Sequence, residues 1–496
     1  MEHTEAAQIA AVGGALGAVP VIMMRDRAAS LVGFALLGIA TALVSRSLIG
    51  DRDLELLLTE PTGIALVGVG ALAALGLAVL LVRYPAVVPV ALLAVAPFRI
   101  PVEVGDEDAF LLLPLYLVLA ASVLALAYRM LRGYVAASPP LLVTLPLAAF
   151  VVFSAVSFLW TRDEREGGIA LAFFVFPFVA GFGVVARSPV AMWLPRALGV
   201  TLVALGTFFA AVGLWQAQTR TLFFASDLEV ANAYTSFFRV TSLFKDPSLY
   251  GRYLFVPIAF LLVALLLRRG RPLEWIGAGA LLAFLFAGLY FSYSQSSFVA
   301  LFVVTFGVAL LGAGRRLRIV LAASAAAATL AAAGFAAQAI DGESAKEVTS
   351  GRSRLVSITL DAFQVNPVVG VGIGGQPRAS ADANSRKSAR RSASHTTPLT
   401  VLAELGIVGF ALYGWTLVAA AWALLRVTRR DRLLGMSLAA VLLVLVVHSL
   451  LYAGFFEDPL TWGVFGAAAA VLAYRAAPAA SPSAETPPEP PALQAH

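Results

Sequence analysis

The sequence contains no cysteine, few histidines and little charge. Without cysteine the chain cannot form a disulfide framework, a thiolate nucleophile, an iron–sulfur cluster or a cysteine zinc site. The four histidines are too few to favour a multi-histidine metal centre. Charged residues make up 13% of the chain and hydrophobic residues 60%, whereas a soluble domain is about 25% charged. This composition excludes a soluble enzyme and a disordered chain alike, and it indicates a membrane protein.

Long apolar runs fill most of the chain. A bilayer core about 30 Å thick requires about 20 apolar residues per helix, and we identify such runs by the charges, prolines or glycines that bound them. They lie near residues 7–24, 28–48, 61–82, 85–98, 109–128, 141–159, 168–186, 197–217, 253–268, 272–291, 296–314, 318–337, 398–426, 433–452 and 459–475. The run at 85–98 is short and bounded by proline, so it is either a span or a half-helix. The sequence therefore predicts an all-α, polytopic integral membrane protein with about 14–15 transmembrane helices.

Arginine is concentrated in alternate loops between these runs. The arginine-bearing loops lie near residues 25–27, 83, 129–132, 187–196, 268–271, 315–318, 426–432 and 475. Acidic residues are concentrated in the opposite loops, near 51–55, 103–108, 163–164 and 457–458. Because basic residues favour cytoplasmic loops, the first set is predicted to be cytoplasmic. Topology thus explains the net charge of +6, and no nucleic-acid partner is expected.

Two outer segments are long and basic, which departs from this pattern. They divide the chain into six predicted parts: N-terminal transmembrane helices (1–217), an extracytoplasmic segment (218–252), transmembrane helices (253–337), a large extracytoplasmic loop with short amphipathic helices (338–397), C-terminal transmembrane helices (398–475) and a disordered cytoplasmic tail (476–496). The tail is predicted to be disordered because its Ala, Pro, Ser and Glu residues cannot bury enough apolar surface.

The basic residues of these outer segments have two explanations. Long loops are translocated whatever their charge, and this remains an open explanation for the tract at 386–391, which lies in a Ser/Ala-rich stretch. The other explanation is an anionic ligand, because guanidinium groups bind phosphate in a bidentate manner. Arg239 and Arg354 favour the ligand, since their neighbours are typical of ordered structure.

The residues around Arg354 form a helical pattern. Leu355, Ile358, Ala362 and Phe363 recur at helical spacing before an Asn-Pro pair, which predicts a short amphipathic helix at the membrane surface. The glycines that follow, at 370, 372, 374 and 375, lack the spacing of a dinucleotide-binding motif and predict a tight turn. Close approach of this turn to a phosphate is the alternative.

Two histidines lie away from the chain ends. His395 directly precedes Thr396, Thr397 and Pro398, where a membrane helix is predicted to begin. A histidine in this place is either a cap, a surface residue or a catalytic group that titrates near neutral pH. His448 lies inside an apolar run, and we expect it to form hydrogen bonds between helices.

Three segments share their order and residues with a known family. RVTSLFKDPSLYGRYL at 239–254 has an arginine before an aromatic residue and a proline, and SGRSRLVSITLDAFQVNPVVGVGIGG at 350–375 leads from arginine into a Pro-x-x-Gly-x-Gly turn. In HTTPLTVLAELGIVGF at 395–410, ten residues separate His395 from Gly406, with Glu404 in a Glu-Leu-Gly sequence. Together they resemble the O-antigen ligase and Wzy-type O-antigen polymerase superfamily. Ser248 and Thr396 stand where the family commonly has Asn, which leaves the choice between ligase and polymerase open.

The resemblance implies an enzyme that moves a glycan from an undecaprenyl-diphosphate carrier to a lipid or glycan acceptor. It would work at the outer face of the cytoplasmic (inner) membrane, among membrane lipids. The resemblance assigns binding of the donor diphosphate to Arg239, Arg352 and Arg354, with Arg252 as a further candidate, because the leaving group builds up negative charge. It assigns the role of general base to His395. Direct displacement would invert the anomeric carbon, and we expect no metal and no cofactor.

A multi-pass transporter or flippase for an envelope lipid or polysaccharide is the main alternative. Such proteins carry ionisable residues or broken helices near the middle of the bilayer. The centres of the predicted spans hold almost no ionisable residues, and the unusual residues lie outside them. A membrane scaffold is less consistent with the sequence, because the loop at 338–397 is too strongly marked for a linker.

Overall fold

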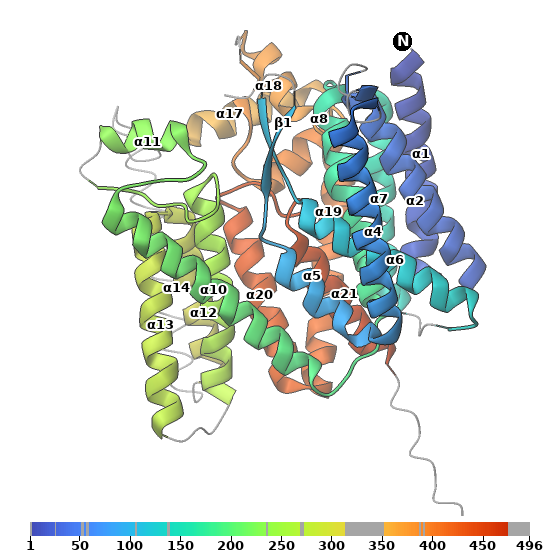
Figure 1. The fold of residues 1–496 in the computed structure, drawn as a ribbon. Coiled ribbons are helices and arrows are strands. Elements are labelled where there is room, and N and C mark those ends of the chain that lie inside the picture. Colours follow the sequence, from blue (N-terminus) through green and yellow to red (C-terminus); the bar gives the residue numbers. More distant parts are fainter. Residues whose placement is uncertain are drawn as a thin grey trace, which may run out of the picture.

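The apolar runs form long helices in the computed structural model (Figure 1). The structure describes residues 2–24, 26–50, 54–55, 59–104, 107–135, 139–234, 237–267, 272–312, 352–385, 388–389 and 392–474. The long helices are α1 (Glu2–Met23), α2 (Arg27–Leu48), α4 (Pro61–Arg83), α6 (Leu113–Leu131), α7 (Leu141–Val156), α10 (Leu194–Thr219), α12 (Pro247–Leu267), α13 (Pro272–Ser292), α14 (Gln295–Gly312), α19 (Thr397–Arg430), α20 (Arg432–Ser449) and α21 (Pro459–Ala473). One further span runs from α8 (Glu164–Ile169) through the π-helical residues 170–175 into α9 (Phe176–Ala186).

Eleven of the helices among the described residues are long and apolar enough to cross a membrane. Three shorter apolar helices, Pro85–Val95, Ser296–Gly307 and Pro459–Ala473, accompany them. The first of these contains α5 (Val88–Val95) and corresponds to the short, proline-bounded run at 85–98. The predicted span at 318–337 and the predicted tail at 476–496 lie outside the described residues. An all-α, polytopic membrane fold is therefore confirmed.

One small hairpin is an exception to the helical prediction. Strands β1 (Ile100–Val104) and β2 (Glu107–Leu111) pair in antiparallel fashion, with Ile100 opposite Leu111. The predicted start of the apolar run at residue 109 is therefore wrong, because α6 begins at Leu113. Residues 109–111 are apolar but belong to β2, and its partner β1 (IPVEV) has the alternation of apolar and other residues that is typical of a strand.

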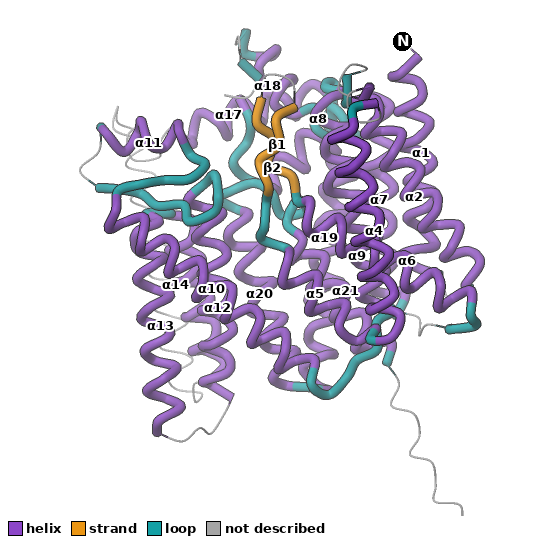
Figure 2. Tube along the Cα trace, in the orientation of Figure 1, coloured by secondary structure: helices purple, strands orange, loops and turns teal. Residues whose placement is uncertain are grey.

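The short helices α11 (Ser226–Ala233), α17 (Arg352–Val365) and α18 (Gln376–Ala383) lie at one end of the bundle (Figures 1 and 2). The hairpin lies at the same end. Because α17 buries Ile358 and Ala362, the predicted amphipathic helix is confirmed, and it ends at Val365 before the Asn-Pro pair. The segments that the sequence marked as unusual are therefore gathered on one end of the membrane domain.

A break in α19 receives the glycine turn that follows α17. Gly406 has φ 63° and ψ −165°, so the helix is interrupted there. The backbone N–H groups of Ile407 and Val408 donate to Pro367 O (2.9 Å) and Val368 O (3.2 Å). In return, Val371 and Gly372 donate to carbonyl oxygens of α19.

Positive φ angles allow this turn to fit. Gly370, Gly372 and Gly374 have φ between 73° and 88°, a region that glycine adopts without steric cost. A Cβ on Gly406 would overlap the Val368 backbone. The predicted tight turn is confirmed, and its close backbone approach is to α19 and to residues 157–167.

Candidate functional site

A cavity of about 1020 Å³ lies at the end of the bundle that carries α11. Its walls come from residues 99–101, from residues 222–231, from the segment leading into α12 (239–249) and from Tyr452. The basic residues Arg99, Arg239 and Lys245 line it together with the acidic residues Glu229 and Asp246. A second, apolar cavity of about 140 Å³ among the helices has no ionisable residue in its lining. Ionic chemistry is therefore possible in the first cavity.

The backbone of Arg239 is held at this cavity by the side chain of Asn232. Its N–H donates to Asn232 Oδ1 (3.1 Å), and Asn232 Nδ2 donates to Arg239 O (3.0 Å). The guanidinium Nε donates to Ser292 O at 3.4 Å. Burial lowers the pKa of the Arg239 guanidinium, while nearby Asp246 acts in the opposite direction.

The carboxylate of Asp246 is used at the start of α12. Its Oδ1 accepts hydrogen bonds from the backbone N–H groups of Ser248 (2.6 Å) and Leu249 (3.4 Å). An acidic side chain at a helix N-terminus interacts favourably with the helix dipole. The negative charge of Asp246 is thus partly balanced by the helix, and the balance of the cavity lining is cationic.

Arg99 is a cavity residue that the sequence analysis missed. It is half-buried between α5 and the hairpin, far in the sequence from Arg239. The signal was available, because Arg99 is the only basic residue in a loop that otherwise carries Glu and Asp. The four acidic residues of the loop, Glu103, Asp106, Glu107 and Asp108, hide this signal, because they predict an acidic loop as a whole.

The arginines of the large loop lie on α17. Arg354 is exposed in the first turn of this helix, and Arg352 begins the helix, although its side chain lies outside what the structure describes. The structure therefore groups Arg239 with Arg99 and Lys245 in the cavity and leaves Arg354 on the surface at the same end of the bundle. The tract 386–391 is described only at residues 388–389.

His395 is exposed just before α19, which begins at Thr397 as the sequence predicted. Gln376, a buried residue at the start of α18, holds the chain on the N-terminal side of this histidine. Its Nε2 donates to Ser392 O (3.0 Å), and its Oε1 accepts from Ser394 N (2.9 Å). The same Nε2 lies 2.7 Å from Ser380 Oγ. No local pattern in the sequence indicates this role of Gln376, because its partners are 16 and 18 residues away.

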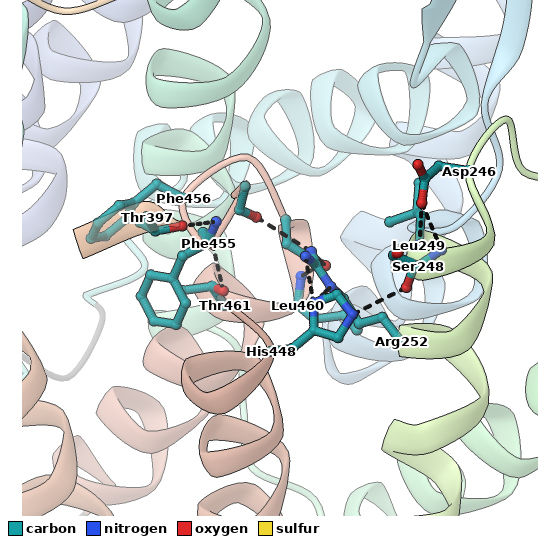
Figure 3. A network of polar contacts seen from close by, with 12 residues as sticks. Asp246, Ser248, Leu249, Arg252, Thr397, His448, Phe455, Phe456, Leu460 and Thr461 are labelled. Carbon is teal, nitrogen blue, oxygen red and sulfur yellow. Dashed lines mark hydrogen bonds and ion pairs between the residues drawn. The ribbon is translucent and has the colours of Figure 1, made fainter. Parts of the chain in front are cut away.

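Arg252, a predicted donor-binding residue, is buried at 3% exposure (Figure 3). Its Nη1 lies 2.6 Å from Asp458 Oδ2, and its Nε and Nη2 lie 3.3 and 3.1 Å from His448 Nδ1. A further bond reaches Gly454 O. These contacts direct the guanidinium into the protein, and binding of a donor by Arg252 stays a prediction.

His448 joins three helices. From α20 it contacts Arg252 and Ser248 O on α12, and its Nε2 lies 3.3 Å from Ser296 Oγ on α14. The prediction that His448 forms hydrogen bonds between helices is therefore confirmed.

Among the residues that the structure describes, no group of three or more His, Cys, Asp or Glu side chains could hold a metal ion.

The fold and the site define a multi-pass membrane protein with a cationic cavity at the end of the bundle that carries a histidine-bearing loop. Residues 280–414 match the model of the family described as O-antigen ligase. The match includes α17, α18, His395 and Gly406, and it bears out the resemblance to the O-antigen ligase/polymerase superfamily. Arg239 and Arg252 lie before the matched residues. No curated protein matches the chain.

Proposed function

We propose that the protein transfers a glycan from an undecaprenyl-diphosphate carrier to the hydroxyl of a lipid or glycan acceptor, on the extracytoplasmic side of the cytoplasmic membrane. The observation that carries this proposal is the cavity of about 1020 Å³ with three basic side chains in its lining. The family match, which includes His395, supports a glycan-transferring enzyme.

Arg99, Arg239 and Lys245 bind the donor diphosphate in this proposal. A diphosphate carries several negative charges, and its charge grows as the bond to the sugar breaks. Guanidinium groups stabilise such charge strongly where water is restricted, as around half-buried Arg239. Arg352 and Arg354, at the start of α17, contribute to the same anionic donor from the loop side. The diphosphate of the donor is already a good leaving group for the sugar, so the reaction requires no nucleotide.

His395 acts as the general base in this proposal. The acceptor oxygen attacks the anomeric carbon and gives its proton to the imidazole, while the bond from that carbon to the diphosphate oxygen breaks and the diphosphate leaves with the electron pair. A single displacement of this kind inverts the anomeric configuration. An imidazole suits the task because its ordinary pKa lies near neutrality.

A transporter or flippase is the alternative function, and the buried group Arg252, His448 and Asp458 is the observation that favours it. Ionisable residues inside a membrane domain often mark a transport route. However, Arg252 lies in the second turn of α12, His448 lies at the end of α20 and Asp458 caps α21. The group is therefore near the helix ends, away from the middle of the spans.

An assay with purified protein in liposomes separates the two functions. If the protein is a transferase, a donor with a labelled glycan should yield a labelled acceptor, and the bond between the glycan and the carrier diphosphate should be broken. Movement of intact donor between leaflets, without any new glycan–acceptor bond, would instead identify a transporter.

The orientation can be tested in the same cysteine-free chain. Ala383→Cys, an exposed position at the end of α18, should react with a membrane-impermeant thiol reagent in intact cells. Arg429→Cys, an exposed position at the far end of α19, is the matched control and should stay unlabelled. The reverse labelling would refute the extracytoplasmic location of the site.

A further inference from the structure

Arg252, His448 and Asp458 form a buried polar group inside an apolar bundle, with exposures of 3%, 0% and 2%. Burying charged groups is costly unless they are paired and hydrogen-bonded. The group lies between the cation cavity and the start of α19 (Figure 3). The position of the group between these two parts of the molecule suggests that it connects them.

The hydrogen bonds fix the protonation state of the histidine. A guanidinium can only donate, so His448 Nδ1 must accept from Arg252 (3.3 and 3.1 Å). The proton is then on Nε2, which donates to Ser248 O at 3.1 Å. His448 is neutral in this arrangement, and the carboxylate of Asp458 balances the charge of Arg252. A group whose charges and hydrogen bonds are satisfied in this way is suited to holding segments together.

One side of the group contacts the wall of the cation cavity, which is the cavity lined by Arg99, Arg239 and Lys245. Ser248, which accepts from His448, also donates its N–H to Asp246, a cavity residue. Tyr452 is another cavity residue, and its ring centroid lies 5.6 Å from Arg252 Cζ and from the His448 ring. The buried group thus contacts the cavity wall at two points.

The other side of the group holds the start of α19. Arg252 Nη1 donates to Gly454 O, and the next residue, Phe455, donates its N–H to Thr397 Oγ1 at 3.4 Å. Thr461 Oγ1 donates to Phe455 O at 2.7 Å and fixes this segment to α21. Thr397 is two residues from His395. A continuous series of bonded segments therefore runs from the cavity wall to the helix that begins beside His395.

We propose that Arg252, His448 and Asp458 are positioning residues that set the cation cavity and the His395 end of α19 at a fixed separation. This inference rests on the proposed function, in which the donor diphosphate occupies the cavity and His395 takes the acceptor proton. Reactive groups must meet within a few tenths of an ångström of the productive geometry, and a displacement of about 1 Å costs about 100-fold in rate. In this proposal Arg252 acts through its protein partners and not as a ligand of the donor. Loss of the group should therefore lower turnover and leave donor affinity close to its wild-type value.

The first test changes the hydroxyl that joins the two sides. Thr397→Val removes the acceptor for Phe455 N–H at nearly constant volume and should lower kcat by about tenfold, with unchanged affinity for undecaprenyl diphosphate. Thr397→Ser keeps the hydroxyl and should restore kcat. Thr416→Val is the matched control, because Thr416 is also buried in α19 but bonds only within its own helix, to Leu412 O. Equal activity of Thr397→Val and Thr416→Val would overturn the proposal.

The second test removes the charges as a pair. Replacing one partner of a buried pair leaves an uncompensated charge, whereas replacing both is often tolerated. Arg252→Met combined with Asp458→Asn removes both charges and keeps a side chain that can cap α21. The double variant should fold, bind undecaprenyl diphosphate like the wild type and lose about 100-fold in kcat. Full turnover in this variant would overturn the proposal.

A distance measurement tests the positioning role without the reaction. Spin labels at Tyr234→Cys and Ala383→Cys, two exposed sites on the cavity side and the His395 side, should give a narrow distance distribution in the otherwise wild-type chain. The distribution should broaden in the double variant and stay narrow in Thr416→Val. An unchanged distribution in the double variant would refute the positioning role even if the wild-type protein transferred no glycan. Absence of glycan transfer with a broadened distribution would refute the proposed function, and with it the catalytic purpose of the group.

Discussion

Two buried arginines, Arg187 and Arg252, lie in different parts of the bundle and have different roles. Arg187 follows α9 and donates to the carbonyl oxygens of Pro20, Val21 and Met24 at the end of α1. Arg252 instead pairs with the carboxylate of Asp458 and with His448. Both side chains are almost fully buried, at 4% and 3% exposure. Burial alone therefore does not indicate what an arginine does.

The partners explain the difference. The carbonyl groups at a helix C-terminus carry partial negative charge and favour a cation, so Arg187 closes the end of α1. Burial lowers the pKa of Arg187 to about 10, which leaves it charged at neutral pH. The hydrogen bonds of its guanidinium go to α1, α2 and α9 or to residues next to them. Arg252 contacts segments that lead to the cavity and to His395, so the two arginines should separate stability from turnover.

The largest effect on turnover should come from His395, at the Arg252 end of the molecule. His395→Ala should lower the rate by about two to four orders of magnitude, which is the usual contribution of a positioned general base. Binding of undecaprenyl diphosphate, measured by equilibrium titration, should persist. His395→Asn keeps a hydrogen-bonding side chain without a base, and near-normal turnover in that variant would show that His395 has only a structural role.

Arg239 should give the next largest effect, and it should appear in donor affinity. Loss of a hydrogen bond to a charged group costs about 1.5–3 kcal/mol, so Arg239→Ala should weaken binding of undecaprenyl diphosphate by about 10-fold to 100-fold. Arg239→Lys should recover little of this, because an ammonium cannot reproduce the planar pair of donors. Arg378→Ala is the control, since Arg378 forms an exposed ion pair with Asp382 on α18. Equal donor affinity in the Arg239 and Arg378 variants would contradict the assignment.

Gln376 should have a smaller effect, of the kind proposed for Arg252. Gln376→Leu removes both bonds to the segment before His395 and should lower kcat by about tenfold, with donor affinity unchanged. Gln376→Glu keeps an acceptor for Ser394 N–H but loses the donor to Ser392 O, and it should recover part of the rate. A change confined to donor affinity would contradict this role.

Arg187 should have the smallest effect on turnover and a clear effect on stability. Arg187→Leu leaves the carbonyl groups of α1 without their donor and should lower the free energy of unfolding by about 2–4 kcal/mol. Thermal unfolding in detergent measures this loss, and steady-state assays below the transition should show normal kcat and donor affinity. A catalytic defect in well-folded Arg187→Leu would remove the contrast between the two arginines.

Local pattern predicted several parts of the site. The helical spacing of Ile358 and Ala362 identified α17, and the glycine series identified the turn after it. The start of α19 followed from the polar sequence before an apolar run. Each of these features depends on neighbours within a few residues, and so each could be read from the sequence.

The long-range features could not be predicted in this way. Arg252 and Asp458 are 206 residues apart, and no periodicity connects them. Arg99 reaches the cavity because the hairpin places it there, and the hairpin is only 12 residues long from Ile100 to Leu111. Gln376 is a polar residue in a polar loop, so neither its burial nor its two backbone partners left a signal.

The break in α19 at Gly406 has a consequence for exchange of parts between related proteins. Pro367 and Val368 supply acceptors that complete the backbone hydrogen bonds of α19, and α19 supplies acceptors for the turn. Neither segment has a complete set of backbone partners by itself. The loop is therefore not a removable module: a soluble fragment of residues 352–397 should not keep its structure, and a chimera should exchange the loop together with the first turns of α19 to remain folded.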